Sequence, residues 1–135
     1  MEATINKLMK GLQRLATVDA VRRVGDSVAL DDAGRVTAIS ISNDHENAKN
    51  LTGLIIDEEA AALQYLHISG IETLLEIVFS RGLPELAYAD LSSCALAAIT
   101  LPPGFSKLEQ LYLHNNKLQQ ITFKAACPEM MLLDL

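Results

Sequence analysis

One apolar pattern recurs at a fixed interval in the C-terminal half of the chain. In residues 108–121, LEQLYLHNNKLQQI, its members are Leu108, Leu111, Leu113, Leu118 and Ile121. The pattern also occurs 22 residues earlier, as Leu86, Ala89, Leu91, Cys94, Leu96 and Ile99, and 22 residues later, as Met130, Leu133 and Leu135. A period of this length predicts a solenoid, in which each unit buries its apolar side chains against the next unit.

Two less regular copies precede these units. One consists of Leu63, Leu66, Ile68, Leu74 and Ile77, and the other of Val36, Ile39, Ile41, Leu51 and Leu54. The spacing between copies widens to 23 and then to 27 residues. The additional residues of the first copy fall in the polar stretch 43–50, where a loop can accept an insertion without disturbing the core. The sequence therefore predicts five strands, one per copy.

One position inside the repeat requires a polar group. Asn116 occupies it in the most regular unit, where its amide can donate to and accept from backbone groups that would otherwise be buried without partners. Cys94 occupies the same position one unit earlier and is a weaker substitute. The second half of each unit repeats as well, and Leu101-Pro102-Pro103 favours an extended return segment.

These residues resemble the leucine-rich repeat family, whose consensus is L-x-x-L-x-L-x-x-N/C-x-L. Residues 108–118 match it fully and residues 86–96 nearly so, with Ala89 in place of a large apolar residue, whereas the two earliest units have no clear Asn at the polar position. The resemblance covers residues 36–135 as about four and a half repeats, the last one incomplete. It implies an α/β fold, a right-handed solenoid with a curved parallel sheet on its concave side. It also implies binding of another macromolecule, most often a protein, although fold alone does not fix function.

Residues 1–35 are predicted to form an N-terminal cap. Residues 4–16 place apolar side chains at the i, i+3, i+4, i+7 spacing of an amphipathic helix, at Ile5, Leu8, Met9, Leu12 and Leu15. Residues 28–30 and 36–41 flank Asp31-Asp32-Ala33-Gly34, which indicates a hairpin that covers the edge of the sheet. The segment DDAGRVTAISI is similar to the first segment of intracellular bacterial repeat proteins, including the repeat domains that precede the GTPase module of Roco proteins.

Composition narrows the possible functions. The 135 residues suffice for one domain, and its core must be aliphatic because half of the residues are apolar while Trp is absent. The net charge is −6. A nucleic-acid-binding surface normally contains clustered Lys and Arg, and the sequence has no such cluster. No apolar run is long enough for a signal peptide or a membrane span, so we expect a cytoplasmic protein without a membrane partner. Cys94 and Cys127 occupy different positions of the repeat, and we expect no disulfide between them.

The residues between the leucines must point away from the core, and they define the predicted binding surface. They form three rows: Ala38, Tyr65, Tyr88, Gln110 and Leu132; Ser40, His67, Asp90, Tyr112 and Asp134; Ser42, Ser69, Ser92 and His114. All three tyrosines of the chain lie in these rows, and no Lys or Arg does. We predict a partner-binding patch of Tyr65, His67, Tyr88, Asp90, Tyr112 and His114. The alternative is that tyrosine is simply a good strand residue.

Catalysis, metals and cofactors receive little support. His67 and Asp90 are expected on adjacent strands with Ser69 and Ser92 nearby, but no nucleophile elbow or phosphate-binding loop accompanies them. The histidines and cysteines, including His45, share no metal-ligand spacing. We therefore expect no catalytic residues, no metal site, no cofactor and no enzymatic activity.

The last strand ends the chain without a cap. Met130, Leu133 and Leu135 would be exposed there, which suggests either the N-terminal piece of a longer protein or an interface, including one with a second copy. The favoured function is a non-enzymatic protein-interaction module that binds through the concave face. The alternative is an N-terminal regulatory segment of a larger multidomain enzyme, such as a Roco-type GTPase.

Overall fold

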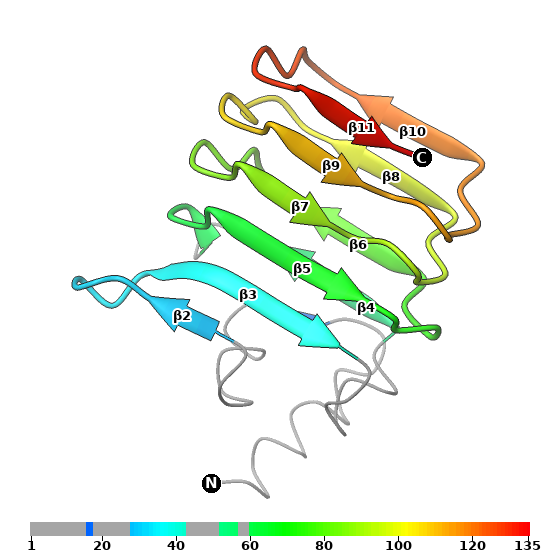
Figure 1. Ribbon diagram of the computed structural model, residues 1–135, viewed down its shortest axis with the longest axis horizontal. Helices are drawn as coiled ribbons and strands as arrows, with labels where there is room; N and C mark the ends of the chain where they lie inside the picture. The colour runs from blue at the N-terminus through cyan, green and yellow to red at the C-terminus, as the bar shows by residue number, and fades with distance from the viewer. Residues whose placement is uncertain (1–15, 18–27, 43–51, 57–59) are drawn as a thin grey trace, which may run out of the picture.

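The computed structural model describes residues 16–17, 28–42, 52–56 and 60–135, and the regular elements within them are strands. In chain order they are β1 (Ala16–Thr17), β2 (Val28–Leu30), β3 (Val36–Ser42), β4 (Gly53–Ile56), β5 (Tyr65–Ser69), β6 (Glu76–Phe79), β7 (Tyr88–Asp90), β8 (Ala98–Leu101), β9 (Gln110–Tyr112), β10 (Gln120–Phe123) and β11 (Leu132–Asp134). Figure 1 shows how they stack along the molecule.

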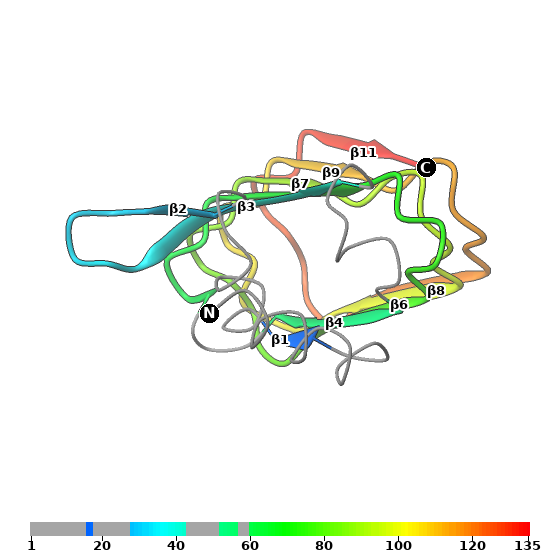
Figure 2. The same cartoon turned by 90° about the horizontal axis from the view of Figure 1, so that it is seen from below.

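The strands form two layers, as Figure 2 shows from below. One layer is a six-stranded sheet in the order β11-β9-β7-β5-β3-β2, and the other layer contains the sheets β1-β4-β6 and β10-β8. From β3 onward the chain alternates between the two layers, and neighbouring strands within each layer are parallel. The molecule is therefore a β-solenoid, as the repeat period predicted.

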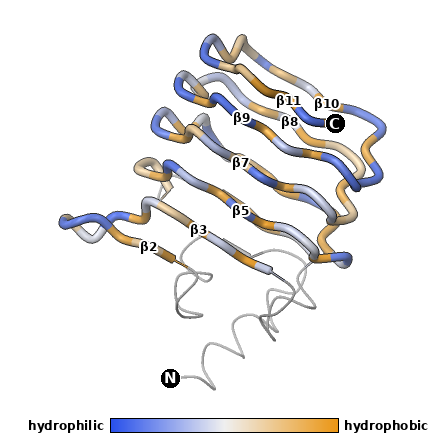
Figure 3. Tube along the Cα trace, viewed as in Figure 1, coloured by the Kyte–Doolittle hydropathy of each residue, from blue (hydrophilic) through white to orange (hydrophobic). Residues whose placement is uncertain are grey.

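The core lies between the layers and follows the repeat. Ile39, Leu66, Ala89, Leu111 and Leu133 align as Cα partners across the six-stranded sheet. The first four of these side chains are at most 1% exposed. Figure 3 shows hydrophobic and hydrophilic residues alternating along strands such as β5. The core is largely aliphatic, with Phe79 and Phe105 packed edge to face at a centroid distance of 5.3 Å.

The return layer corrects the predicted fold class. An α/β fold would have helices on this side, but the described residues contain no α-helix, and the return segments pair as parallel strands. Short sequences such as EIVF and AITL bury every second residue, which suits a strand with one face on the core. The return segment is therefore extended, as Leu101-Pro102-Pro103 indicated, but it also joins a hydrogen-bonded sheet. Residues 4–15 of the predicted helix lie outside the described residues, and Ala16 belongs to β1.

Three successive turns leave the six-stranded sheet through the same backbone conformation. Gly70, Ser93 and Asn115 have φ angles of 73°, 57° and 56°, in the left-handed region. Glycine adopts this conformation without strain, and Asn does so more readily than most residues with a side chain. The bend after β5, β7 and β9 therefore repeats from turn to turn.

The N-terminal hairpin is present where the sequence predicted it. β2 pairs antiparallel with β3, with Ala29 opposite Ala38 and an irregularity between Ala29 and Leu30. The amide of Gly34 donates to the carbonyl of Asp31 at 2.9 Å to close the turn. The amide of Arg35 donates to the Asp31 carboxylate, and this bond is the main cause of the lowered pKa of Asp31. β2 thus forms one edge of the six-stranded sheet, while the predicted loop at 43–50 lies outside the described residues.

Candidate partner-binding face

The register of the six-stranded sheet confirms the first two outward rows. In the third row it pairs Ser42 with Ser69, whereas Ser92, which was predicted to point outward, is buried. Tyr65 is paired with Ala38 on one side and with Tyr88 on the other, and Tyr88 is paired with Gln110. In the second row, Asp90 is paired with His67 and Tyr112. The predicted binding residues therefore share one face, which we call the tyrosine face: Tyr65, His67, Tyr88, Asp90, Tyr112 and His114.

The three tyrosine rings contact one another across three strands. Tyr65 and Tyr88 stack with parallel rings, at a centroid distance of 4.7 Å and an interplanar angle of 5°. Tyr88 also contacts Tyr112, at 5.5 Å with the rings tilted by 47°. Contacts of this kind add to the burial of apolar area and fix ring orientation. The tyrosines therefore form one continuous and ordered aromatic surface.

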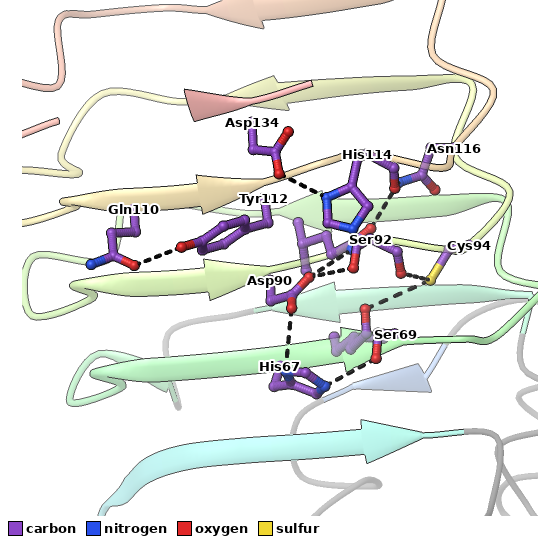
Figure 4. A network of polar contacts seen from close by, with 12 residues as sticks. His67, Ser69, Asp90, Ser92, Cys94, Gln110, Tyr112, His114, Asn116 and Asp134 are labelled. Atoms are coloured by element: carbon purple, nitrogen blue, oxygen red, sulfur yellow. Dashed lines mark hydrogen bonds and ion pairs between the residues drawn. The ribbon is translucent and has the colours of Figure 1, made fainter. Parts of the chain in front are cut away.

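A polar network lies beside the rings on β5 and β7 (Figure 4). Asp90 Oδ1 accepts hydrogen bonds from the hydroxyl of Ser92 at 2.6 Å and from its amide at 3.0 Å. His67 Nε2 lies 3.0 Å from the Ser69 hydroxyl. His67 Nδ1 lies 3.5 Å from Asp90 Oδ2, which meets the ion-pair distance but forms no hydrogen bond, and Nδ1 is buried without a hydrogen-bond partner.

The second histidine, unlike His67, forms a hydrogen bond with its neighbouring carboxylate. His114 Nδ1 lies 3.0 Å from Asp134 Oδ2, which links the end of β9 to β11. The Tyr112 hydroxyl donates to Gln110 Oε1 at 3.0 Å. Each predicted polar residue of the tyrosine face therefore has a neighbouring side chain that restricts its rotamer. Restricted side chains lose less conformational entropy on binding.

The phenol of Tyr88 has a raised pKa. Burial raises its pKa above the ordinary value, and the carboxylate of Asp90 and the other two tyrosines act in the same direction. Both causes disfavour a phenolate on this face. Tyr88 therefore remains a neutral hydrogen-bond donor at neutral pH.

Ser69, His67 and Asp90 follow one another in space, which invites comparison with a hydrolytic triad. The two short hydrogen bonds of Asp90 go to Ser92, however, and the contact between Asp90 and His67 is the longest in the series. A triad requires the carboxylate to orient the imidazole through a hydrogen bond to Nδ1. The predicted absence of catalytic residues stays a prediction, and the observed bonds fit a fixed polar surface.

The predicted polar position of the repeat behaves as the sequence indicated. Asn116 Oδ1 accepts from the amide of Leu96 at 3.0 Å, and Nδ2 donates to the carbonyls of Leu91 and Leu113 at 2.8 and 3.0 Å. One turn earlier, the Cys94 thiol donates to the carbonyls of Ile68 and Ser92 at 3.7 and 3.5 Å. Asn116 joins adjacent turns through stronger bonds, because sulfur is a weak donor.

The last turn leaves apolar side chains at the edge of the solenoid. Leu133 and Leu135 are 39% and 66% exposed, whereas Met130 packs partly against the core. A hollow of about 300 Å³ opens beside them between the layers, with Leu118 and Ile121 in its lining. These side chains occupy positions that the next turn covers elsewhere in the solenoid.

Sequence reasoning missed an apolar surface on the return layer. Leu75 and Val78 are 59% and 42% exposed, and a hollow of about 530 Å³ runs between β6 and β8. The signal was present as the nearly continuous apolar run LLEIVF at residues 74–79. Alternation within that run places Ile77 and Phe79 in the core and leaves Val78 outside.

The structure offers no arrangement for a metal ion or a membrane-spanning helix in the part that it describes. No group of three or more His, Cys, Asp or Glu side chains there could hold a metal. No helix in the same residues is long and apolar enough to cross a membrane.

The chain is similar in sequence to one segment of a longer protein. A protein from Runella zeae is 41% identical over 122 residues, covering 86% of this chain. That protein is named a Roc-COR-CHAT protease. The chain spans 13% of its length. No protein-family model and no solved structure matches the chain.

This similarity bears on the two family resemblances differently. The Roc-COR-CHAT relative and the β-solenoid together fit a repeat domain from a Roco-like protein, the resemblance that the segment DDAGRVTAISI suggested. The leucine-rich repeat itself is not confirmed, because no family model matches and the return layer is made of strands.

Proposed function

We propose that this chain is a non-enzymatic recognition module that binds a protein partner through the tyrosine face. The observation that supports this function is the contact between Tyr65, Tyr88 and Tyr112 across three neighbouring strands. Tyrosine is enriched at the energetic centres of protein interfaces, where it supplies rigid contact area and a polar end. None of the three rows of the face contains Lys or Arg, the side chains with the most rotamer freedom to lose.

The charge of the chain favours a basic or neutral partner. The net charge is −6, and the rows of the tyrosine face contain the carboxylates of Asp90 and Asp134. Electrostatic complementarity speeds association and rejects partners of like charge. For the same reason nucleic acid is a poor candidate. The free thiols of Cys94 and Cys127 fit a reducing compartment such as the cytoplasm.

The test is to select peptides from a displayed 12-residue library on the 135-residue protein and to measure their affinity for variants. We expect Tyr88→Ala and Tyr112→Ala each to weaken binding by about tenfold or more, because Tyr88 joins the other two rings and Tyr112 extends the aromatic surface to β9. We expect the free energy of unfolding to change by no more than about 1 kcal/mol, the size of one cross-strand pair.

Leu75→Ala is the control on the return layer, because it removes a large, solvent-exposed side chain next to β6, away from the tyrosine face. Selected peptides should bind this variant as they bind the wild type. Peptides that bind Tyr88→Ala and Tyr112→Ala undiminished, or variants that lose stability in proportion to binding, would show that the tyrosines are structural.

A second function is supported by the Roc-COR-CHAT relative. We propose that the chain is a regulatory repeat segment of a larger multidomain protein of the Roco type, in which the tyrosine face can bind another domain of the same polypeptide. The 13% coverage of the relative motivates this proposal. The reading frame after Leu135 tests it. Further repeats followed by G-x-x-x-x-G-K-[ST] are expected, and an immediate stop codon is the contrary result.

The exposed edge of the last turn carries a third proposal, self-association through Met130, Leu133 and Leu135. Unpaired strands with apolar side chains are templates for pairing with another chain. Sedimentation of the 135-residue protein over a range of dilutions tests it. We expect the protein to associate, and we expect Leu133→Lys but not Leu75→Lys to abolish this association. A monomer at all concentrations is the contrary result.

A further inference from the structure

The aromatic row of the tyrosine face ends abruptly at Tyr65. The register places Tyr65 opposite Ala38 of β3, and Ala38 opposite Ala29 of β2. Tyr88 and Tyr65 thus supply two stacked rings, and the next two positions of the same row supply only methyl groups. We call Ala29 and Ala38 the alanine shelf. Because a methyl group is much shorter than a phenol, the surface forms a step between Tyr65 and the alanine shelf.

The step leaves one face of the Tyr65 ring available. Its other face is covered by the parallel ring of Tyr88 at 4.7 Å, yet Tyr65 remains 39% exposed. The His67 ring lies 6.3 Å along the same strand and is parallel to Tyr65 within 4°. Because ring normals in a cross-strand stack point from strand to strand, the free face of Tyr65 is turned toward Ala38. The parallel ring of His67 lies beside it, opposite Ser40.

The charge beside this surface determines which flat group suits it. Asp90 is paired with His67, Asp134 lies three strands from Tyr65 on β11, and the outward rows contain no Lys or Arg. The basic side chain of the neighbouring hairpin, Arg35, is held by Asp31 at 2.8 Å. Ser40, which is exposed and lies opposite His67, offers a hydroxyl acceptor at the border of the shelf. A planar cation is complementary to this combination of ring faces, the Asp90 carboxylate and the Ser40 hydroxyl.

We propose that the tyrosine face recognises an arginine of its partner, whose guanidinium group stacks on the free face of Tyr65 above the alanine shelf. This inference rests on the proposed recognition function and specifies the chemistry of the partner. A guanidinium group stacks on an aromatic ring and presents its N–H donors in the plane, whereas an ammonium group offers a charge without a flat surface.

The experiment titrates the 135-residue protein with three probe peptides at low ionic strength. The probes are acetylated and amidated (Gly-Arg)3, (Gly-Lys)3 and (Gly-citrulline)3, in which citrulline keeps the planar shape of arginine and removes its charge. Chemical-shift changes at Ala38 and Tyr65 report the site, and the titration curve reports the affinity. We expect (Gly-Arg)3 to bind about threefold more tightly than (Gly-Lys)3, and (Gly-citrulline)3 to bind at least about fivefold more weakly than (Gly-Arg)3.

Two variants of the step distinguish stacking from general attraction to an acidic surface. Tyr65→Phe retains the ring and should bind (Gly-Arg)3 normally, whereas Tyr65→Leu should bind it about fivefold more weakly. Ala38→Leu fills the shelf without touching the charge and should have the same effect as Tyr65→Leu. Thermal unfolding of each variant shows whether a loss of binding results from a loss of fold. Ala38→Ser is a milder replacement at the same position, and we expect it to retain binding.

Two results would overturn the inference. Equal affinity for (Gly-Arg)3 and (Gly-citrulline)3 excludes recognition of the charge, and undiminished binding to Ala38→Leu excludes the shelf. In either case the proposed function stands if library-selected peptides still depend on Tyr88 and Tyr112. If those peptides are also indifferent to Tyr88→Ala and Tyr112→Ala, the proposed function fails together with the inference.

Discussion

At the scale of single residues, Asn116 shows why the repeat needs one polar side chain in an apolar sequence. Its amide satisfies the backbone of Leu96, Leu91 and Leu113 at the point where the chain leaves β9. Backbone groups in such bends have no partner in either sheet and cost free energy if they are left unpaired. The motif could be recognised from sequence because the chemistry of the position admits few residue types.

Asn116→Ala should lower the free energy of unfolding by about 1–3 kcal/mol, because it leaves partly buried backbone donors and acceptors without partners. Urea denaturation measures the change. Gln119→Ala, an exposed residue in the same turn, is the matched control and should change stability by less than about 0.5 kcal/mol. Equal losses in the two variants would mean that water replaces the amide at no cost.

Tyr88 gives the chain a specific response to alkaline pH. Since its pKa is raised in the folded state, its contribution to stability is complete below the ordinary pKa of 10.0 and is lost as pH rises beyond it. Thermal unfolding of wild type and Tyr88→Phe between pH 8 and 11 measures this contribution. We expect the wild type to lose more stability over this range than Tyr88→Phe, which keeps the ring and cannot ionise. Parallel curves would contradict the burial of the phenol.

At the scale of elements, the two layers differ in how far the sequence revealed them. The six-stranded sheet was predictable to the residue, since regular leucine spacing fixes which side chains alternate inward, and Tyr65, His67 and Asp90 lie in the expected rows. The return layer was predicted only as extended. Its pairing into β4–β6 and β8–β10 depends on contacts between turns, which a single unit does not encode.

The bends between the layers depend on one close approach of backbone to backbone. A Cβ atom added at Gly82 would lie 2.2 Å from the Pro103 carbonyl oxygen and 2.5 Å from the Gly104 Cα. The 22-residue period brings Gly82 and Gly104 to the same place in successive turns. Both contacts are with main-chain atoms, so a side chain at position 82 forces the two turns apart.

Gly82→Ala should therefore destabilise the protein by about 2–3 kcal/mol, the cost of forcing extra volume into a packed site. Gly34→Ala is the matched control, because Gly34 has a φ of +79° but nothing within 4 Å of the added atom. That variant should lose only about 1 kcal/mol, from the left-handed backbone. The comparison uses chemical denaturation, and a smaller loss for Gly82→Ala than for Gly34→Ala would contradict the stacked bends.

At the scale of the whole molecule, the solenoid presents two large surfaces of different character. The six-stranded layer carries the ordered tyrosines with their polar neighbours, and the return layer carries exposed Leu75 and Val78. Sequence reasoning identified the first surface because strand alternation assigned its residues to one side. It missed the second surface because the run LLEIVF is apolar at outward as well as inward positions, and the pattern of core residues assigns only the inward ones.

The map of amide chemical-shift changes on binding of a library-selected peptide is the most direct test of recognition through the tyrosine face. We expect the largest changes in β5, β7 and β9, around Tyr65, Tyr88 and Tyr112, with small changes in β6 and β8. In the same titration with Tyr88→Ala, the chemical-shift changes should become smaller and the affinity for the peptide should fall. A map centred on Leu75 and Val78, with the tyrosine face unchanged, would contradict recognition through the tyrosine face.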